Sequence, residues 1–165
     1  MTGNSSGGRR VLVTGMSGTG KSSALAELGR RGFRVVDTDS TEWSEWVPPV
    51  GDDDGEWLWR EDRMAELLAA EDERALFVSG CMSNQGAFYD RFEAVVLLSA
   101  PAEVLLQRID DRTTNDYGKG AGERERILFH LETVEPLLRA TATHELDASR
   151  PLAEVVAALD AIGRR

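Results

Sequence analysis

The feature that most constrains this chain is the segment GMSGTGKS at residues 15–22, which fits the pattern G-x-x-x-x-G-K-[ST]. The apolar residues Val11, Leu12 and Val13 precede it, and a helix-like stretch at residues 22–28 follows it. This strand, loop and helix context is typical of a phosphate-binding loop, and it makes a chance match in a glycine-rich chain rare. The sequence therefore predicts a site for a nucleoside triphosphate.

Each residue type in the loop has a physical reason to be there. Glycines let the backbone N–H groups turn toward phosphate oxygens, Lys21 can reach the β- and γ-phosphates, and the Ser22 hydroxyl can bind Mg²⁺. The chain has 17 arginines but only two lysines, Lys21 and Lys119, which favours a specific need for an ammonium group at position 21. The residues expected to bind the nucleotide here are Gly15, Met16, Ser17, Gly18, Thr19, Gly20, Lys21, Ser22 and Ser23.

Composition limits the class of protein. With 165 residues, 41% apolar content and a net charge of −10, we expect one soluble globular domain over residues 9–165, behind a flexible terminus at 1–8. The single cysteine, Cys81, excludes an intramolecular disulfide and suits a cytoplasmic location. No apolar run is long enough to suggest a signal peptide or a membrane span. The expected state is a monomer or weak dimer.

The negative charge is local. Residues 37–73 contain fourteen Asp or Glu against two arginines, Arg60 and Arg63, and the rest of the chain is slightly positive. Part of this acidity, such as Asp52 to Asp54, has the character of a solvated loop. The overall acidity argues against nucleic acid as a partner, because a phosphate backbone would be repelled.

Short apolar runs alternate with helical patterns, which is typical of βα units on a parallel sheet. The predicted fold is a three-layer α/β domain with five parallel strands and helices on both faces. Strands are expected at 10–14, 34–36, 75–79, 94–98 and 143–146, and helices at 21–30, 56–70, 101–112, 123–140 and 151–162. The irregular stretches 39–55 and 113–122 exceed an ordinary connection, which favours an acceptor-site region over about 39–73 and a lid over about 113–122.

Asp37 and Asp39 follow the second predicted strand, two residues apart. If that strand continues to Asp39, both carboxylates leave the same side of the backbone. Phosphoryl transfer needs one carboxylate to hold Mg²⁺ and another to accept a proton from an attacking hydroxyl, and either aspartate could take either role. The alternative is a turn that caps the next element.

Arg108 and Arg112 stand one helical turn apart and can project from one face, where guanidinium groups could stack on a purine and hold phosphate oxygens. The alternative is a helix stabilised by pairs between these arginines and Asp110 or Asp111. The following glycine-rich segment has the composition of a flap that closes over the nucleotide and excludes water.

Together with Ser149, Arg150 and Pro151 after the fifth predicted strand, these motifs resemble the small P-loop kinases of the nucleoside-monophosphate-kinase-like group, which includes shikimate, gluconate and adenylate kinases. The resemblance covers residues from about 9 to 162. It implies Mg-ATP as the donor, Arg108 stacked on adenine, Arg112 on the transferring phosphates, and Arg150 with Pro151 on the far side of the base. It also implies metal and substrate-hydroxyl roles for Asp37 and Asp39.

The chain departs from this group after the third predicted strand. It lacks the aspartate of adenylate kinases, and CMSNQ at residues 81–85 replaces the glycine triplet of shikimate kinases. We expect Gly80, Asn84 and Gln85 to contact the second substrate, although a helix cap is equally consistent with Asn84. The pair Trp59 and Arg60 resembles a shikimate-kinase feature that implies an anion anchor at Arg60, with ion pairing on its own helix as the alternative.

Four tryptophans, at 43, 46, 57 and 59, crowd the same region, where most are expected to pack the loop and one or two could stack on a substrate ring. His130, His144 and Cys81 have no spaced partners, which favours structural roles. The leading hypothesis is an ATP-dependent kinase that transfers the γ-phosphoryl group to a hydroxyl of a small metabolite, with a phosphate group as the alternative acceptor. The alternatives are a nucleoside or nucleotide kinase and, in a different class, a nucleotide-binding ATPase switch.

Overall fold

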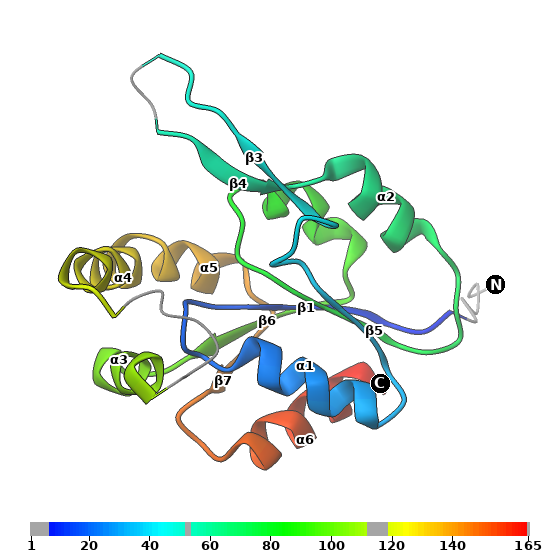
Figure 1. Cartoon of the computed structure of the whole chain (residues 1–165). Helices are drawn as coiled ribbons and strands as arrows, with labels where there is room; N and C mark the ends of the chain where they lie inside the picture. The colour runs from blue at the N-terminus through cyan, green and yellow to red at the C-terminus, as the bar shows by residue number, and fades with distance from the viewer. Residues whose placement is uncertain (1–6, 52–53, 112–118, 165) are drawn as a thin grey trace.

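A computed structural model describes residues 7–51, 54–111 and 119–164. Its centre is a five-stranded parallel sheet with the strand order β2-β5-β1-β6-β7 (Figure 1). The strands are β1 (Arg10–Thr14), β2 (Arg34–Asp37), β5 (Leu76–Ser79), β6 (Ala94–Ser99) and β7 (His144–Asp147). All four pairings are parallel, so the predicted α/β sheet is confirmed.

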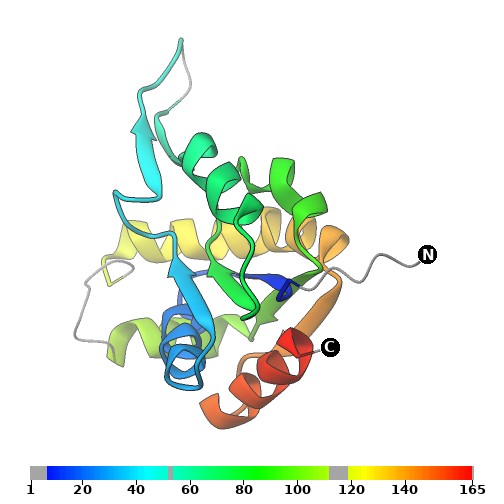
Figure 2. The same ribbon diagram turned by 90° about the vertical axis from the view of Figure 1, so that its right-hand side faces the viewer.

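Helices cover both faces of this sheet (Figures 1 and 2). On one face, α1 (Lys21–Arg30) and α6 (Leu152–Gly163) pack in one apolar cluster with alternate residues of β1, including Val11 and Val13. On the other face, α2 (Glu61–Ala69) and the 3₁₀ helix η1 (Gln85–Arg91) pack against Leu12 of the same strand. The alternation of side chains along β1 therefore places its apolar residues on both faces.

Three further helices, α3 (Ala102–Asp111), α4 (Ala121–Thr133) and α5 (Glu135–Thr141), lie beyond the end of β1 where the phosphate-binding loop begins (Figure 1). A third cluster joins them to the sheet, with Met16 of the loop, Leu97 of β6, Leu105 of α3 and Leu138 of α5. The loop is thereby packed against α3 and α5.

Two expectations from the sequence are wrong in detail. The region 39–55 is not wholly irregular, because it contains β3 (Ser44–Val47), and the predicted helix at 56–70 begins as β4 (Glu56–Trp59) before α2. β3 and β4 form an antiparallel hairpin that projects from the domain (Figure 1). The strand segment EWLW is rich in tryptophan, which favours extended backbone over helix.

The predicted helix at 123–140 is divided into α4 and α5. The division falls at Val134, whose φ and ψ are −99° and −45°, and Pro136 lies in the first turn of α5. Proline has no backbone N–H and fits the first turn of a helix but not its interior, so a new helix begins here. No helix in the described parts of the chain is long and apolar enough to cross a membrane.

Candidate active site

The loop after β1 has the backbone of a phosphate cradle. Gly18 and Gly20 have φ of 87° and 89°, in the left-handed region that side chains with a Cβ rarely enter. A Cβ on Gly18 would also lie 2.9 Å from the Leu105 carbonyl oxygen of α3. The loop can therefore pack closely on α3 only with glycine at position 18. Thr19 closes the turn, since its hydroxyl donates to the Met16 carbonyl at 2.9 Å.

Lys21 is partly buried and lies across its own loop. Its ammonium donates to the carbonyl oxygens of Gly15 at 2.6 Å and Met16 at 3.1 Å. Burial lowers the pKa of Lys21, while the nearby Cys81, Asp39 and Asp37 act in the opposite direction. An ammonium has three donors, so one remains for an anion in front of the loop.

The strand β2 ends at Asp37, so Asp37 and Asp39 do not continue as one strand with both carboxylates on one side. Asp37 Oδ1 accepts the backbone N–H of Asp39 at 3.0 Å, and its Oδ2 accepts the hydroxyl of Ser22 at 2.8 Å. Asp37 thus joins the end of β2 to the start of α1. The turn that was the alternative interpretation is therefore present. The second carboxylate oxygen of Asp37 nevertheless contacts Ser22 of the loop.

A cavity of about 170 Å³ opens in front of the loop, and we call it the loop cavity. Its lining residues are Gly15, Met16, Ser17, Lys21, Asp39, Cys81, Ile127 and His130. Burial raises the pKa of Asp39, with Lys21 acting in the opposite direction. Burial likewise raises the pKa of the Cys81 thiol. The cavity therefore places one cation beside a carboxyl group that is easier to protonate than an ordinary aspartate.

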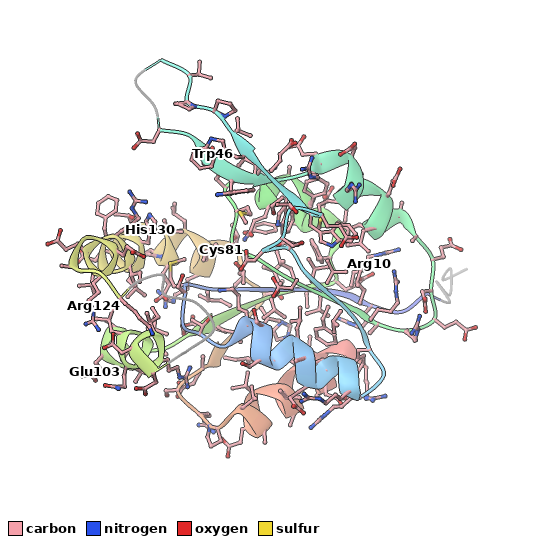
Figure 3. The ribbon with its side chains drawn as sticks, viewed as in Figure 1. Arg10, Trp46, Cys81, Glu103, Arg124 and His130 are labelled. Carbon is pink, nitrogen blue, oxygen red and sulfur yellow. The ribbon has the colours of Figure 1, made fainter. Side chains whose placement is uncertain are left out.

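A second cavity of about 660 Å³ lies under the β3–β4 hairpin, and we call it the hairpin cavity. Its lining residues are Asp39, Ser40, Thr41, Ser44, Trp46, Trp57, Met82 and Arg126. Asp39 lines both cavities, and α4 contributes to the wall of both. Figure 3 shows His130 on α4, Trp46 on the hairpin and Cys81 on the same side of β1. A volume of this size is within the range of small-molecule sites.

On the far side of the loop, Arg108 and Arg150 approach the same aspartate. Arg108 Nη1 donates to the Gly18 carbonyl at 3.4 Å, and Arg150 Nε lies 3.9 Å from Asp147 Oδ2. Hydrogen bonds from Ser149 lower the pKa of Asp147, and the charges of Arg150 and Arg108 add to that shift. The structure thus brings these two arginines together. Pro151 follows Arg150 and occupies the N-cap position of α6.

Arg112, predicted to contact the phosphates, lies outside the described residues, as do residues 113–118 of the predicted lid. Arg124 of α4, which Figure 3 labels, pairs with Asp110 of α3. That pair fixes α4 relative to α3 on either side of the segment.

Asn84 and Gln85 are held by the protein itself. The Asn84 side chain accepts the Trp59 N–H and donates to the Trp59 carbonyl, both at 3.0 Å. Gln85 is buried and bonds to the Met82 N–H, the Thr14 hydroxyl and the Tyr89 hydroxyl. Neither residue lines the loop cavity or the hairpin cavity. The structure therefore does not bring their amides to either cavity.

Gly80 is also buried, and it supports the hairpin. A Cβ at this position would lie 2.2 Å from Thr38 Oγ1 and 3.1 Å from Trp59 Nε1. Those two atoms form a hydrogen bond of 2.9 Å, and the Thr38 hydroxyl donates in turn to the Ser79 carbonyl at 2.7 Å. Glycine thus leaves room for the bond that connects the buried Trp59 ring to the end of β2.

Arg60 does not line either of the two cavities. Its guanidinium pairs with Glu45 of β3 at 2.9 Å and donates to the Thr41 carbonyl at 3.0 Å. The alternative interpretation was an ion pair with a residue on the helix of Arg60 itself. The structure instead shows an ion pair between Arg60 and Glu45 of the hairpin. The predicted anion anchor is thus engaged in holding the hairpin.

Sequence reasoning missed Arg126 and assigned His130 a structural role, although both line cavities. These residues stand four apart on α4, with Ile127 between them lining the loop cavity, so they share one helix face. That spacing is visible in the sequence, but only the fold shows which surface the face meets.

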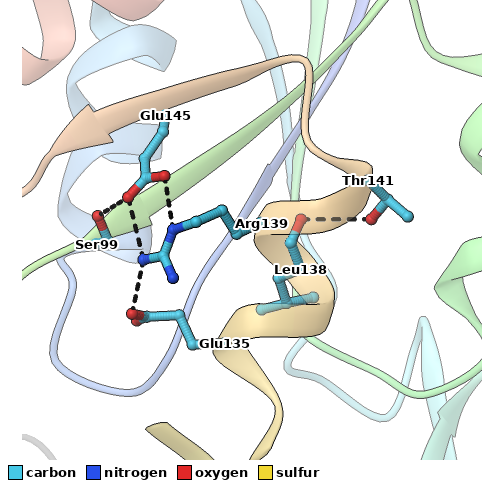
Figure 4. A network of polar contacts seen from close by, with 6 residues as sticks. All are labelled: Ser99, Glu135, Leu138, Arg139, Thr141 and Glu145. Carbon is cyan, nitrogen blue, oxygen red and sulfur yellow. Dashed lines mark hydrogen bonds and ion pairs between the residues drawn. The ribbon is translucent and has the colours of Figure 1, made fainter. Parts of the chain in front are cut away.

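A polar network holds α5, the continuation of α4, to the sheet edge (Figure 4). Arg139 pairs with Glu135 at 3.0 Å and with Glu145 of β7 at 2.9 Å. The hydroxyl of Ser99 at the end of β6 donates to Glu145 at 2.7 Å. The hydrogen bonds from Arg139 and Ser99 lower the pKa of Glu145. The network therefore holds α5, which directly follows the helix α4 that lines both cavities.

The oxygen atoms of Ser22 and Asp37 fit a magnesium ion, which prefers oxygen ligands and retains waters or phosphate oxygens in its other positions. Among the described residues there is no group of three or more His, Cys, Asp or Glu side chains arranged to hold a metal. The described residues thus offer a hydroxyl and a carboxylate to a metal ion.

Comparison with known proteins gives one family match and several solved structures of similar fold. The AAA domain family model matches residues 11–128. No curated protein sequence matches the chain. Similar solved structures include a shikimate kinase from Acinetobacter baumannii in complex with shikimate (TM-score 0.65, 16% identity, 93% of this chain and 92% of that chain covered). Another is a gluconokinase from Sinorhizobium meliloti 1021 (TM-score 0.61, 23% identity, 94% of this chain and 94% of that chain covered). A third is a deoxyadenosine kinase from M. mycoides with bound dATP (TM-score 0.61, 11% identity, 95% of this chain and 100% of that chain covered).

The family match spans more than half of the chain, and the structural matches span nearly all of it at low identity. The chain therefore belongs to the AAA domain family, and its fold is that of the small P-loop kinases of the nucleoside-monophosphate-kinase-like group.

Proposed function

We propose that this protein is an ATP-dependent phosphotransferase that moves the γ-phosphoryl group of ATP to a hydroxyl of a small molecule. In this account residues 9–165 act as one kinase domain, with the loop cavity for the triphosphate and the hairpin cavity for the acceptor. The fold agrees with this assignment, because the gluconokinase and deoxyadenosine kinase structures have names that describe the same type of reaction.

One observation supports the proposal most strongly: Asp39 lines both cavities. A transferase must bring donor and acceptor together at one point, since positioning accounts for much of the rate enhancement in phosphoryl transfer. An ATPase switch needs no second cavity that meets the phosphate site. The shared carboxylate therefore favours transfer over simple hydrolysis.

The chemistry of the groups at this point fits the reaction. Lys21 presents an ammonium to the loop cavity, where charge develops on the β- and γ-oxygens during transfer. Asp39 has a raised pKa, which makes it a better proton acceptor for an attacking hydroxyl than an ordinary aspartate. We assign Asp39 to orient the acceptor and to receive its proton.

The remaining roles follow from position. We assign Ser22 and Asp37 to Mg²⁺, which when bound would neutralise charge on the phosphate oxygens. Arg108 and Arg150, which approach Asp147 from two elements, are assigned to the two faces of the adenine ring. Arg112 and a lid over residues 113–122 remain proposals from the sequence, with the phosphates as the expected ligand of Arg112.

Tryptophan fluorescence tests whether the protein is a kinase or a switch. The hairpin cavity contains Trp46 and Trp57, whereas the loop cavity has no tryptophan in its lining. ATP alone should therefore change the emission little, and the acceptor should change it strongly and reduce hydrolysis relative to transfer. A large response to ATP alone, with hydrolysis that depends on a protein partner and on no metabolite, would identify a switch. A response confined to nucleosides or nucleotides would identify a nucleoside or nucleotide kinase.

A further inference from the structure

The hairpin cavity has a corner built from two indole rings. Trp46 of β3 and Trp57 of β4 are cross-strand partners whose ring centroids are 6.0 Å apart with an interplanar angle of 66°. The two residues are 50% and 47% exposed, and both line the cavity together with Met82. Two large, half-exposed aromatic rings in a cavity favour an apolar ligand face.

One face of the Trp46 indole lies close against the backbone of Gly55. A Cβ built on Gly55 would lie 2.4 Å from Trp46 Cζ2 and 2.8 Å from the Val47 carbonyl oxygen. The indole therefore lies directly on the Gly55 backbone, and any larger residue would displace it. A ring held in place in this way offers stacking area with little loss of conformational freedom on binding.

The same cavity has a positive side chain in its lining. Arg126 of α4 is exposed, and among the described residues it is the one Lys or Arg that lines the cavity. Arg124, two residues earlier, pairs with Asp110, but the Arg126 guanidinium makes no hydrogen bond or ion pair with any residue in the described ranges. The acidic stretch of the sequence is residues 37–73, and it contributes Asp39 to the same lining. Among the described lining residues, Arg126 is therefore the group that can attract an anionic part of a ligand.

Asp39 provides the polar end of the cavity, next to Ser40 and Thr41. The carboxylate also faces the loop cavity, where the phosphoryl donor is proposed to lie. A ligand hydroxyl bound at Asp39 would therefore meet the donor. The cavity thus contains three different surfaces: an indole corner, a guanidinium and a carboxylate.

We propose that the hairpin cavity selects an alcohol that carries both a ring and an anionic group. The ring stacks on Trp46 and Trp57, the anionic group pairs with Arg126, and the hydroxyl is directed to Asp39. This inference rests on the proposed function for the role of Asp39, but the ring and anion recognition can be measured as binding alone.

The two indoles could instead serve only to stabilise the hairpin, because cross-strand aromatic pairs contribute to the stability of isolated two-stranded sheets. That explanation assigns no role to Arg126, which lies on α4 and not on the hairpin. A dependence of ligand binding on Arg126 and on both tryptophans therefore distinguishes recognition from hairpin stability.

Calorimetric titration of the full chain tests the selectivity. The probes are three ring-bearing hydroxy acids (D-glucuronate, quinate and 3-hydroxybenzoate), the neutral ring compounds D-glucose and phenol, and the open-chain acid D-gluconate. The tightest binder should be a ring acid, with a Kd at least about tenfold below that of every neutral or open-chain probe. If none of the ring acids binds, or if a neutral or open-chain probe binds as tightly, the proposal is wrong.

Variants then locate the contacts for the tightest ring acid. Arg126→Gln and Trp57→Ala should each raise its Kd at least about tenfold, and Gly55→Ala should raise it by displacing the Trp46 ring. Arg126→Lys should bind better than Arg126→Gln because the charge is retained. The matched controls Arg63→Gln and Phe129→Ala remove an exposed charge and an exposed aromatic ring outside the cavity, and should change Kd less than about twofold.

Circular dichroism confirms that each variant is folded. If Arg126→Gln binds the ring acid like the unmodified chain, the anion recognition is refuted whatever the tryptophan variants show. Failure of the two proposals can be told apart. Ring-acid binding that depends on Arg126 without any phosphoryl transfer would refute the kinase function alone, whereas transfer to an acceptor whose KM is insensitive to Arg126 and Trp57 would refute this inference alone.

Discussion

The hydroxyl of Ser22 donates to Asp37 Oδ2 at 2.8 Å, and this bond joins the first turn of α1 to the end of β2. The contact spans fifteen positions of sequence and brings together the two protein oxygens that suit a magnesium ion. It also separates the two aspartates by environment, since Asp37 faces Ser22 while Asp39 lines the two cavities. The sequence did not decide which aspartate binds the metal and which contacts the acceptor. These environments favour the proposal that Asp37 binds Mg²⁺ and Asp39 contacts the acceptor.

Substitution of the two aspartates tests that division. Asp37→Asn should raise the Mg²⁺ concentration needed for half-maximal activity, because a carboxylate oxygen next to the Ser22 hydroxyl is lost. Asp39→Asn should mainly lower turnover, because the proton acceptor is lost. We expect each change to reduce kcat/KM by about a hundredfold or more. Steady-state kinetics with Mg²⁺ titration distinguishes them, and wild-type kinetics in both variants would mean that the pair is only a turn.

The pH dependence of the rate should report Asp39. Only the ionised carboxylate can accept a proton, so kcat/KM should fall as the pH is lowered through the pKa of Asp39. Burial raises that pKa, so the acidic limb should lie above the ordinary aspartate range. The Asp39→Asn variant should retain its residual activity without this limb. An acidic limb that is identical in both proteins would assign the titration to another group.

Lys21→Met should remove activity and leave the fold intact. Removal of a preorganised charge from a transferring phosphate should cost at least about 10²–10³ in kcat. A Lys21→Met protein with near wild-type turnover and a wild-type circular dichroism spectrum would contradict the role assigned to the ammonium.

The same variant predicts a pH-dependent change in stability. Burial lowers the pKa of Lys21, because removing the ammonium from water costs free energy in the folded state. The neutral side chain of methionine does not have this desolvation cost. The unfolded chain binds the proton more tightly, so the wild-type free energy of unfolding should rise with pH between the folded and the unfolded pKa. The advantage of Lys21→Met should thus be complete below the folded pKa and disappear as the pH rises to the unfolded value. Urea unfolding across alkaline pH measures it, and a gap that widens with pH would have the wrong sign.

Thr38→Val should destabilise the attachment of the hairpin. The buried Thr38 hydroxyl accepts the Trp59 indole N–H at 2.9 Å and donates to the Ser79 carbonyl at 2.7 Å. The substitution keeps the shape but leaves the indole donor without a partner, which should cost about 1–3 kcal/mol in the free energy of unfolding. Thr41→Val, at an exposed position, should change it by less than about 0.5 kcal/mol. Equal effects in the two variants would contradict the role of the Thr38 bond.

The sequence predicts the sheet and the loop well, because both depend on local pattern. Short apolar runs rich in β-branched residues, such as Val11 to Val13, favour interior strands of a parallel sheet, and the loop needs glycine at fixed positions. The hairpin was missed because its two strands pair with each other outside the main sheet, where polar and aromatic residues give no regular alternation.

Side-chain partners depend on tertiary contacts, which explains the remaining differences. The sequence places Glu45 fifteen residues before Arg60, so their ion pair is not visible there. The pairing of β3 with β4 brings the two side chains together, and Arg60 is thereby occupied. Asn84 bonds to a backbone segment twenty-five residues away. The role of Arg126 is not predictable from the sequence, because nothing there indicates that this face of α4 lines a cavity together with the hairpin.

Product analysis by mass spectrometry tests the central claim, that donor and acceptor meet at Asp39. The purified chain is incubated with Mg-ATP and a panel of sugars, polyols, ring acids and nucleosides, in parallel with Lys21→Met and Asp39→Asn. We predict one class of compound that gains a single phosphoryl group with the wild-type protein, with at least about a hundredfold less product in both variants. ATP hydrolysis without any phosphorylated panel member, at a rate that no metabolite changes, would contradict the account.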